Sequence, residues 1–91
     1  MTEILSKKIK FFGRVQGVNF RRQTKDLADR FQVKGWIQNL PDGSVETVFM
    51  GDSDSVYKLL QECLHGLRHA EVESYTMEDY EGEPPEGFKI L

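Results

Sequence analysis

The sequence predicts an α/β sandwich in which one mostly antiparallel sheet carries two helices on the same face. Strand-like and helix-like segments follow each other in the order β-α-β-β-α-β, with a short extra strand at the end. Each segment has one apolar face, and stacking both helices on one side of the sheet buries all of these faces together. The chain has 91 residues, which provide one such core and no room for a second. We therefore expect one domain over residues 1–91.

Four elements are predicted in the first half of the chain. Residues 5–13 form a strand, because apolar residues alternate there with lysines. Residues 21–31 form an amphipathic helix, because apolar side chains recur at helical spacing. Residues 33–39 and 44–51 form two paired strands, because the Pro-Asp-Gly tripeptide at 41–43 is a strong turn signal between them.

A helix and two strands are predicted in the second half. The helix begins near Asp52 or Ser53, since either residue suits a helix N-cap. Its apolar stripe consists of Val56, Leu59, Leu60, Cys63, Leu64 and Leu67. Residues 71–79 form a further strand, residues 81–87 a loop with two prolines, and residues 88–91 a short last strand. This order corresponds to the ferredoxin-like fold, an architecture that hosts many unrelated functions.

The charges are unevenly distributed along the chain. The net charge is −3, yet residues 1–34 hold nine Lys and Arg against three acids, whereas residues 35–91 hold three against twelve. An acidic protein with a basic first third favours a small anion over a nucleic acid or another long polyanion. No apolar run approaches the length of a membrane span, and no secretion signal is recognisable at the start. Cys63 is the only cysteine, which excludes an internal disulfide. We expect a cytoplasmic protein, and we expect it to be a monomer.

The most informative segment spans residues 13–21, Gly-Arg-Val-Gln-Gly-Val-Asn-Phe-Arg. It joins a predicted strand to a predicted helix and contains two glycines four residues apart. Such a turn directs backbone N–H groups at one point, and the adjacent helix N-terminus favours a phosphate or carboxylate. Arg21 stands in the first helical turn, where a cation opposes the helix dipole unless an anion binds there. These residues indicate an anion-binding loop, although a turn that needs glycine only for its backbone has the same composition.

A second segment, residues 35–45, has the sequence Gly-Trp-Ile-Gln-Asn-Leu-Pro-Asp-Gly-Ser-Val and is predicted to form a strand, a tight turn and a strand. Together with residues 13–21 it resembles the two signatures of the acylphosphatase family. The order of the motifs, the gap between them and the closing Phe88-x-Ile90 are also similar, so the resemblance covers essentially the whole chain. It implies the ferredoxin-like fold and an enzyme that hydrolyses small acyl phosphates to a carboxylate and inorganic phosphate.

The resemblance also implies roles for individual residues. Arg21 is expected to bind the substrate phosphate and to stabilise the transition state. Asn39 is expected to orient the attacking water, although its position alone is better explained by the frequency of asparagine at strand ends. The phosphate-binding loop, which contributes mainly backbone N–H groups, consists of Arg14, Val15, Gln16, Gly17, Val18, Asn19 and Phe20. Asn19 differs from the small, apolar or aromatic residue that the family usually has at this position. The difference leaves the preferred acyl chain of the substrate open and does not affect the expected phosphate binding.

No metal or organic cofactor is implied by the resemblance. His65 and His69 are four residues apart, a spacing that suits a metal ion on a continuous helix. Gly66 falls between them, however, where the helix is expected to stop, so we predict no metal site. Thr24, one turn after Arg21, either supports the site or packs in the core.

Two other functions are compatible with parts of the sequence. One is a carbamoyl-phosphate-handling domain, similar to the acylphosphatase-like region of the much longer hydrogenase maturation proteins. The other is a non-catalytic nucleic-acid binder, against which the acidic composition and the lack of an aromatic-rich strand at 44–51 argue. We also expect the Leu91 carboxylate to approach Arg21 if the last strand lies beside the strand at 5–13.

Overall fold

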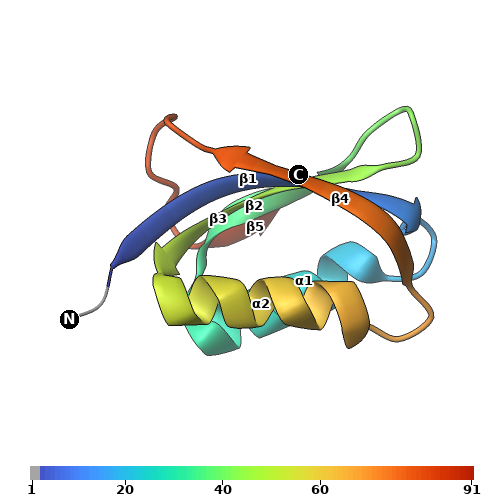
Figure 1. The fold of residues 1–91 in the computed structure, drawn as a ribbon, viewed down its shortest axis with the longest axis horizontal. Helices are drawn as coiled ribbons and strands as arrows, with labels where there is room; N and C mark the ends of the chain where they lie inside the picture. The colour runs from blue at the N-terminus through green and yellow to red at the C-terminus, as the bar shows by residue number, and fades with distance from the viewer. Residues whose placement is uncertain (1–2) are drawn as a thin grey trace.

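The computed structural model describes residues 3–91, which form five strands and two helices (Figure 1). In chain order these are β1 (Ile4–Arg14), α1 (Phe20–Phe31), β2 (Lys34–Asn39), β3 (Val45–Asp52), α2 (Ser53–His65), β4 (Glu71–Asp79) and β5 (Phe88–Ile90). The predicted order of elements is confirmed. The predicted bounds differ from these by one residue at several ends, and α1 begins at Phe20 rather than at residue 21.

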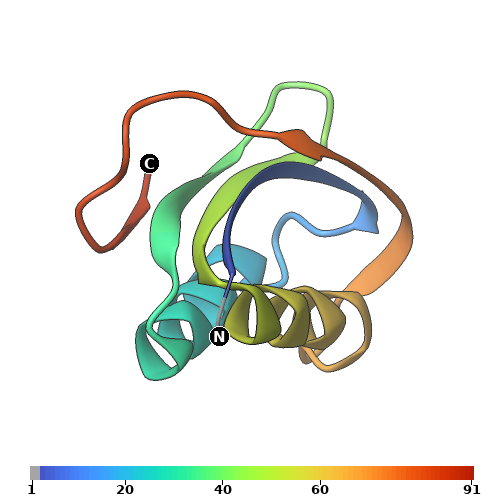
Figure 2. The same cartoon turned by 60° about the vertical axis from the view of Figure 1, so that its left-hand side comes forward.

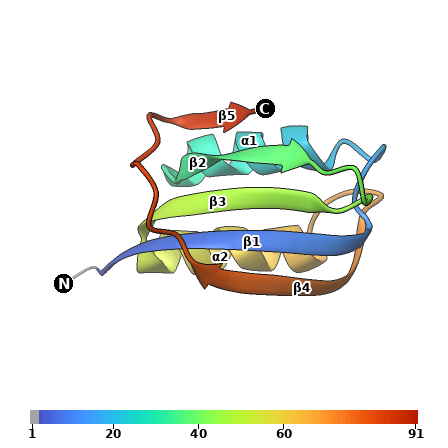
Figure 3. The same ribbon diagram turned by 90° about the horizontal axis from the view of Figure 1, so that it is seen from above.

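The strands form one sheet in the order β4-β1-β3-β2-β5 (Figure 3). Antiparallel pairing joins β1 to β3, β1 to β4 and β2 to β3, whereas β2 and β5 run parallel. The condition attached to the expected approach of Leu91, a last strand beside β1, is not met. Both edges of β1 are already paired, with β3 and with β4, so β5 pairs instead with the open edge of β2. The result is the predicted mostly antiparallel, ferredoxin-like sheet.

Both helices pack on the same face of the sheet, which curves over them (Figure 2). Three phenylalanines from three different elements are among the largest fully buried side chains: Phe11 of β1, Phe20 of α1 and Phe49 of β3. Thr24 of α1 and Cys63 of α2 are buried where the two helices meet. The predicted sandwich is therefore confirmed. Within residues 3–91 no helix is long and apolar enough to cross a membrane.

Gly35 explains why the second motif begins with glycine. Its backbone φ is +151°, a value that residues with a side chain rarely adopt. A Cβ at this position would also lie 1.7 Å from the carbonyl oxygen of Val48 on β3. Any side chain would therefore force β2 away from β3. Asn39 is the last residue of the same strand, so this close approach helps to set the position of the strand end that carries it.

Candidate active site

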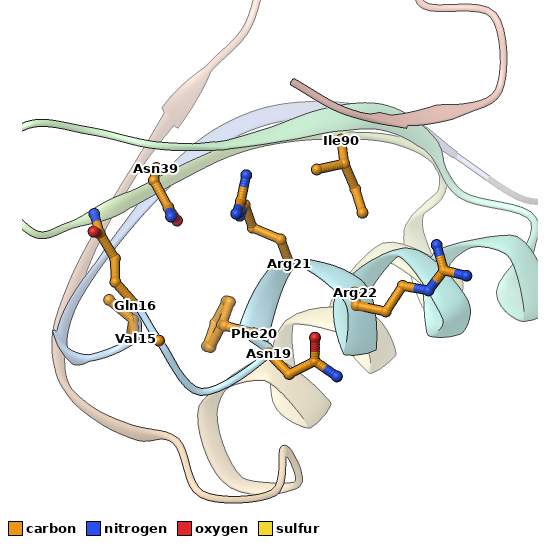
Figure 4. Close-up of a pocket in the computed structure, with 9 residues that line it drawn as sticks. Val15, Gln16, Asn19, Phe20, Arg21, Arg22, Asn39 and Ile90 are labelled. Carbon is orange, nitrogen blue, oxygen red and sulfur yellow. The ribbon is translucent and has the colours of Figure 1, made fainter.

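A cavity of about 210 Å³ lies between the β1–α1 loop, the end of β2 and β5 (Figure 4). It is lined by Val15, Gln16, Gly17, Asn19, Phe20, Arg21, Arg22, Asn39 and Ile90. Drug-sized ligands occupy pockets of roughly 300–1,000 Å³, so this cavity suits a smaller molecule, such as a phosphate with a short organic group. Two arginines and no acidic residue line it, so it also suits an anion.

The β1–α1 loop is anchored to the core at both ends. Val15 and Phe20 are 1% and 2% exposed, and the Phe20 ring packs on Phe11 of β1 with centroids 5.3 Å apart. Between these anchors Gly17 and Asn19 have φ values of +74° and +63°. Glycine and asparagine tolerate this left-handed conformation better than other residues do. The departure from the usual residue at position 19 is thus compatible with the backbone that the loop adopts.

The N-terminus of α1 faces the cavity without a side-chain cap. Asn19 occupies the N-cap position, but its side chain makes no capping hydrogen bond, and the first turn contains no acidic residue. The first N–H groups of a helix have no intrahelical acceptors, and the helix dipole makes this end positive. The cavity therefore combines the features of an anion-binding helix terminus with the charges of two arginines.

Gln16 ties the loop to the β2–β3 turn. Its side-chain amide donates hydrogen bonds to the carbonyl oxygens of Leu40 and Ser44, both at 2.9 Å. The turn itself is closed by Asp42, whose carboxylate accepts hydrogen bonds from the Ser44 N–H and hydroxyl. These hydrogen bonds lower the pKa of Asp42 below its usual value. The loop and the strand end at Asn39 are thereby connected through side-chain hydrogen bonds.

Gln23 connects the loop to a second neighbour, the segment between α2 and β4. Its side-chain amide donates to the carbonyl oxygens of Val18, at 3.2 Å, and Arg68, at 3.1 Å. Its carbonyl oxygen accepts a hydrogen bond from the Arg68 N–H at 2.8 Å. The Gln23 side chain thus joins the later half of the loop to a segment that lies 45 residues further along the chain than Gln23 itself.

Arg21 and Asn39 enter the cavity from different elements, Arg21 from the first turn of α1 and Asn39 from the end of β2 (Figure 4). The Arg21 guanidinium donates a hydrogen bond to a backbone oxygen of Leu91 at 3.3 Å. The expected approach of Leu91 to Arg21 is thus present, but it is reached from β5 on the edge of β2. This contact restrains the guanidinium on the side of the cavity formed by β5.

The structure brings most of the predicted site residues together around one cavity. Arg14 and Val18 are the exceptions among them, because neither lines it. Arg14 is exposed at the end of β1, opposite Glu71 of β4, and Val18 packs against the core. Two lining residues, Arg22 and Ile90, are absent from the predicted site. Ile90 belongs to the closing motif, which was the available signal, whereas Arg22 has no signal beyond its position next to Arg21.

Four other residues considered in the sequence lie away from the cavity. Thr24 is fully buried and its hydroxyl lies 3.5 Å from the Cys63 sulfur, so it packs between the helices. Burial raises the pKa of the Cys63 thiol to about 12. The helix α2 ends at His65, and His69 lies beyond it with a φ of +66°. The two histidines therefore do not share a continuous helix, which removes the basis of their metal-binding spacing.

The fold and the cavity define a small ferredoxin-like protein with a basic cavity beside the β1–α1 loop. Comparisons with known proteins are more specific. The acylphosphatase family model matches residues 7–90. The acylphosphatase of Thermoplasma volcanium is 47% identical over 74 residues, which are 81% of this chain and 82% of that protein. The chain belongs to the acylphosphatase family.

Solved structures show the same relationship. An acylphosphatase from Coxiella burnetii superposes with a TM-score of 0.89 at 31% identity, over 97% of this chain and 93% of that one. Full-length HypF, in a phosphate- and nucleotide-bound form, superposes with a TM-score of 0.86 at 20% identity. That match covers the whole of this chain and only 12% of HypF. At this identity it shows a common fold alone.

Proposed function

We propose that this protein hydrolyses the carboxyl–phosphate anhydride bond of small acyl phosphates, releasing a carboxylate and inorganic phosphate. The observation that carries the proposal is that Arg21, Asn39 and the β1–α1 loop line one small cavity, and that none of the described residues in its lining is acidic. Membership of the acylphosphatase family supports the same reaction.

In the proposed mechanism the loop and Arg21 hold the phosphate. Loop N–H groups and the two-pronged guanidinium bind its oxygens and stabilise the charge that they carry in the transition state. Phosphoryl transfer depends mainly on positioning and charge stabilisation, and these groups supply both. The hydrogen bond to Leu91 supports this role, because it restrains Arg21 before substrate arrives.

Asn39 is proposed to orient a water molecule in line with the bond that breaks. Its uncharged amide can align water without repelling a phosphate dianion. No Asp, Glu or His lines the cavity, so the bound phosphate itself takes the proton from the attacking water. The leaving group is a carboxylate, which is stable without protonation and needs no general acid.

The same lining supports a reaction that does not depend on a metal ion. The cavity offers amides, guanidinium groups and apolar side chains, and none of the carboxylate, imidazole or thiolate groups that most often ligate metals. We therefore expect the positive charge at the phosphate to come from Arg21 and the end of α1.

A benzoyl phosphate assay tests the proposal directly. Purified protein should release benzoate and inorganic phosphate in stoichiometric amounts, and an excess of EDTA over the protein should leave the rate unchanged. An absence of turnover would contradict the proposed hydrolysis. Activity that disappears with EDTA and returns with a divalent cation would contradict only the metal-independent mechanism.

We further propose that the protein acts as a monomer in the cytoplasm. Its single, buried cysteine supports a compartment in which disulfides are not needed for stability. Size-exclusion chromatography with light scattering tests the monomer, and fractionation of the source cells tests the compartment.

A further inference from the structure

Arg22 lines the candidate active site, yet the proposed mechanism assigns it no role. The loop and Arg21 account for the phosphate. In Figure 4 the two arginine side chains diverge, with Arg22 directed along α1 away from Gln16 and Asn39. The cavity therefore has a second cation on the side away from the residues that hold the phosphate and the water.

The surroundings leave the Arg22 guanidinium available to a ligand. Its protein partner is Asp26, one turn along α1, at 3.8 Å, and both side chains are more than 60% exposed. Exposed pairs of this geometry are weak and readily exchanged for another anion. Arg22 also stands in the first turn of α1, where no acidic residue offsets the positive helix end.

Ile90 provides the complementary apolar surface. It lines the same cavity from β5 and is 37% exposed. A substrate whose phosphate lies in the loop thus has the apolar side chain of Ile90 and the guanidinium of Arg22 beside it in the same cavity. An acyl group with a hydrocarbon body and an anionic end matches this order of surfaces.

We propose that Arg22 is a specificity-determining residue that binds a second anionic group on the acyl moiety. The preferred substrates are then acyl phosphates whose acyl group itself carries a carboxylate. This inference rests on the proposed acyl phosphate hydrolysis and extends it to a substrate class. The contact lies away from phosphorus, so it is equally strong in the ground state and the transition state and acts mainly on KM.

The experiment compares 3- and 4-carboxybenzoyl phosphate with the corresponding methylbenzoyl phosphates. The quantity measured is the ratio of kcat/KM for the carboxy substrate to kcat/KM for the methyl substrate. Intrinsic reactivity differs between the two substrates, but it cancels when this ratio is compared between protein variants. Arg22→Gln removes the charge and retains much of the side-chain length, and Arg22→Lys retains the charge.

The matched control is Arg30→Gln, which removes one exposed positive charge from the other end of the same helix. In Arg22→Gln the ratio should fall about twofold to fivefold, the range expected for an exposed ion pair. In Arg22→Lys the ratio should fall less than in Arg22→Gln, and in Arg30→Gln the ratio should be unchanged. The difference in this ratio between Arg22→Gln and the original protein should become smaller at about 1 M salt, because the Debye length is then roughly 3 Å and the ion pair is screened.

Three results would overturn the proposal in distinguishable ways. An unchanged ratio in Arg22→Gln would show that Arg22 does not contact the acyl group. An equal fall in Arg22→Gln and Arg30→Gln would show a long-range effect of net charge instead of a contact. Failure of the original protein to hydrolyse either kind of substrate would contradict the proposed function itself, before any question of specificity.

Discussion

Arg21 shows how one residue can oppose local stability in favour of binding. A cation in the first turn of a helix is unfavourable by about 0.3–1 kcal/mol, because it faces the positive end of the dipole. Here the guanidinium lines a cavity and is restrained by an oxygen of Leu91. A bound anion would offset both the dipole and the charge of Arg21. Local violations of this kind are expected at functional sites.

Replacing Arg21 by lysine should remove most of the activity although the charge is retained. The ammonium is a point charge and cannot make the two-pronged contact of a guanidinium. Loss of one preorganised transition-state donor typically lowers kcat by about 10²–10³. Steady-state kinetics with benzoyl phosphate measures the effect, and Arg30→Lys on the same helix is the control. Near-normal turnover in Arg21→Lys would show that a two-pronged contact from Arg21 is not needed for catalysis.

Asn39→Ala should abolish turnover and leave the binding of inorganic phosphate largely intact. The reason is that the proposed roles lie on different elements, with water orientation on β2 and phosphate binding on the loop and α1. Isothermal titration with phosphate, performed beside the activity assay, separates the two. If affinity and turnover fell together, Asn39 would be a phosphate ligand or a structural residue.

At the scale of elements, two glutamines position the β1–α1 loop. Gln16 connects its first half to the β2–β3 turn, and Gln23 connects its second half to the segment before β4. Loops are usually the mobile parts of a protein, but this one has buried anchors at both ends and braces between them. Such a loop can hold its N–H groups in place before the ligand arrives, which is what preorganised catalysis requires.

Gln16→Met should raise the activation free energy of the reaction by more than it lowers the free energy of unfolding. Methionine has a similar length but cannot donate to Leu40 and Ser44, so the loop is released from the strand end that carries Asn39. A displacement of about 1 Å can lower a rate by on the order of 10²-fold, whereas a lost hydrogen bond costs about 0.5–1.5 kcal/mol of stability.

The measurements for this variant are kcat well below the melting temperature and the melting temperature itself. The exposed Gln61 of α2 offers a matched control, since Gln61→Met makes the same chemical change outside the site. A Gln16→Met protein with normal kcat would show that the hydrogen bonds serve folding alone.

At the scale of the whole molecule, the two helices are packed against the sheet and against each other. Cys63 of α2 lies at their contact, with 1% of its surface exposed and the Thr24 hydroxyl at 3.5 Å. Burial disfavours the thiolate and raises the pKa of the thiol from 9.0 to about 12. Cys63 is therefore a packing residue, and its protonation is coupled to the integrity of the core.

This coupling predicts a loss of stability at alkaline pH. Below pH 9 the thiol is protonated in both the folded and the unfolded chain, so Cys63 contributes no pH dependence. Between pH 9 and about 12 the unfolded chain loses the proton and the folded chain keeps it, so stability falls as the pH rises. The slope attributable to this residue is about 1 kcal/mol per pH unit.

Urea unfolding tests this prediction. The original protein and Cys63→Ala are compared from pH 8 to pH 10.5, in steps of roughly half a pH unit. The alanine variant should be less stable at pH 8 because of the cavity that it leaves. The difference between the two proteins should then narrow as the pH rises, since lysine and tyrosine titrations are common to both. A constant difference would show that the thiol ionises equally in the two states.

The sequence by itself determined the elements, the sandwich and most of the candidate site. Helical and alternating apolar periods are local patterns, so they predicted α1, α2 and the strands to within one or two residues of their observed ends. The glycine-containing loop and Arg21 were recognisable because a cation and two glycines at the start of a helix are typical of an anion-binding site. Asn39 depended on the family resemblance, since asparagine at a strand end has a common structural explanation.

Only the tertiary structure decided how distant segments meet. It placed β5 on the edge of β2, because both edges of β1 are occupied, and so brought Ile90 to the cavity and Leu91 to Arg21. It also gave Gln16 hydrogen-bond partners 24 and 28 residues away. No local period encodes such contacts, because they depend on which strand edges remain open and on side-chain directions that exist only once the sheet and helices have packed.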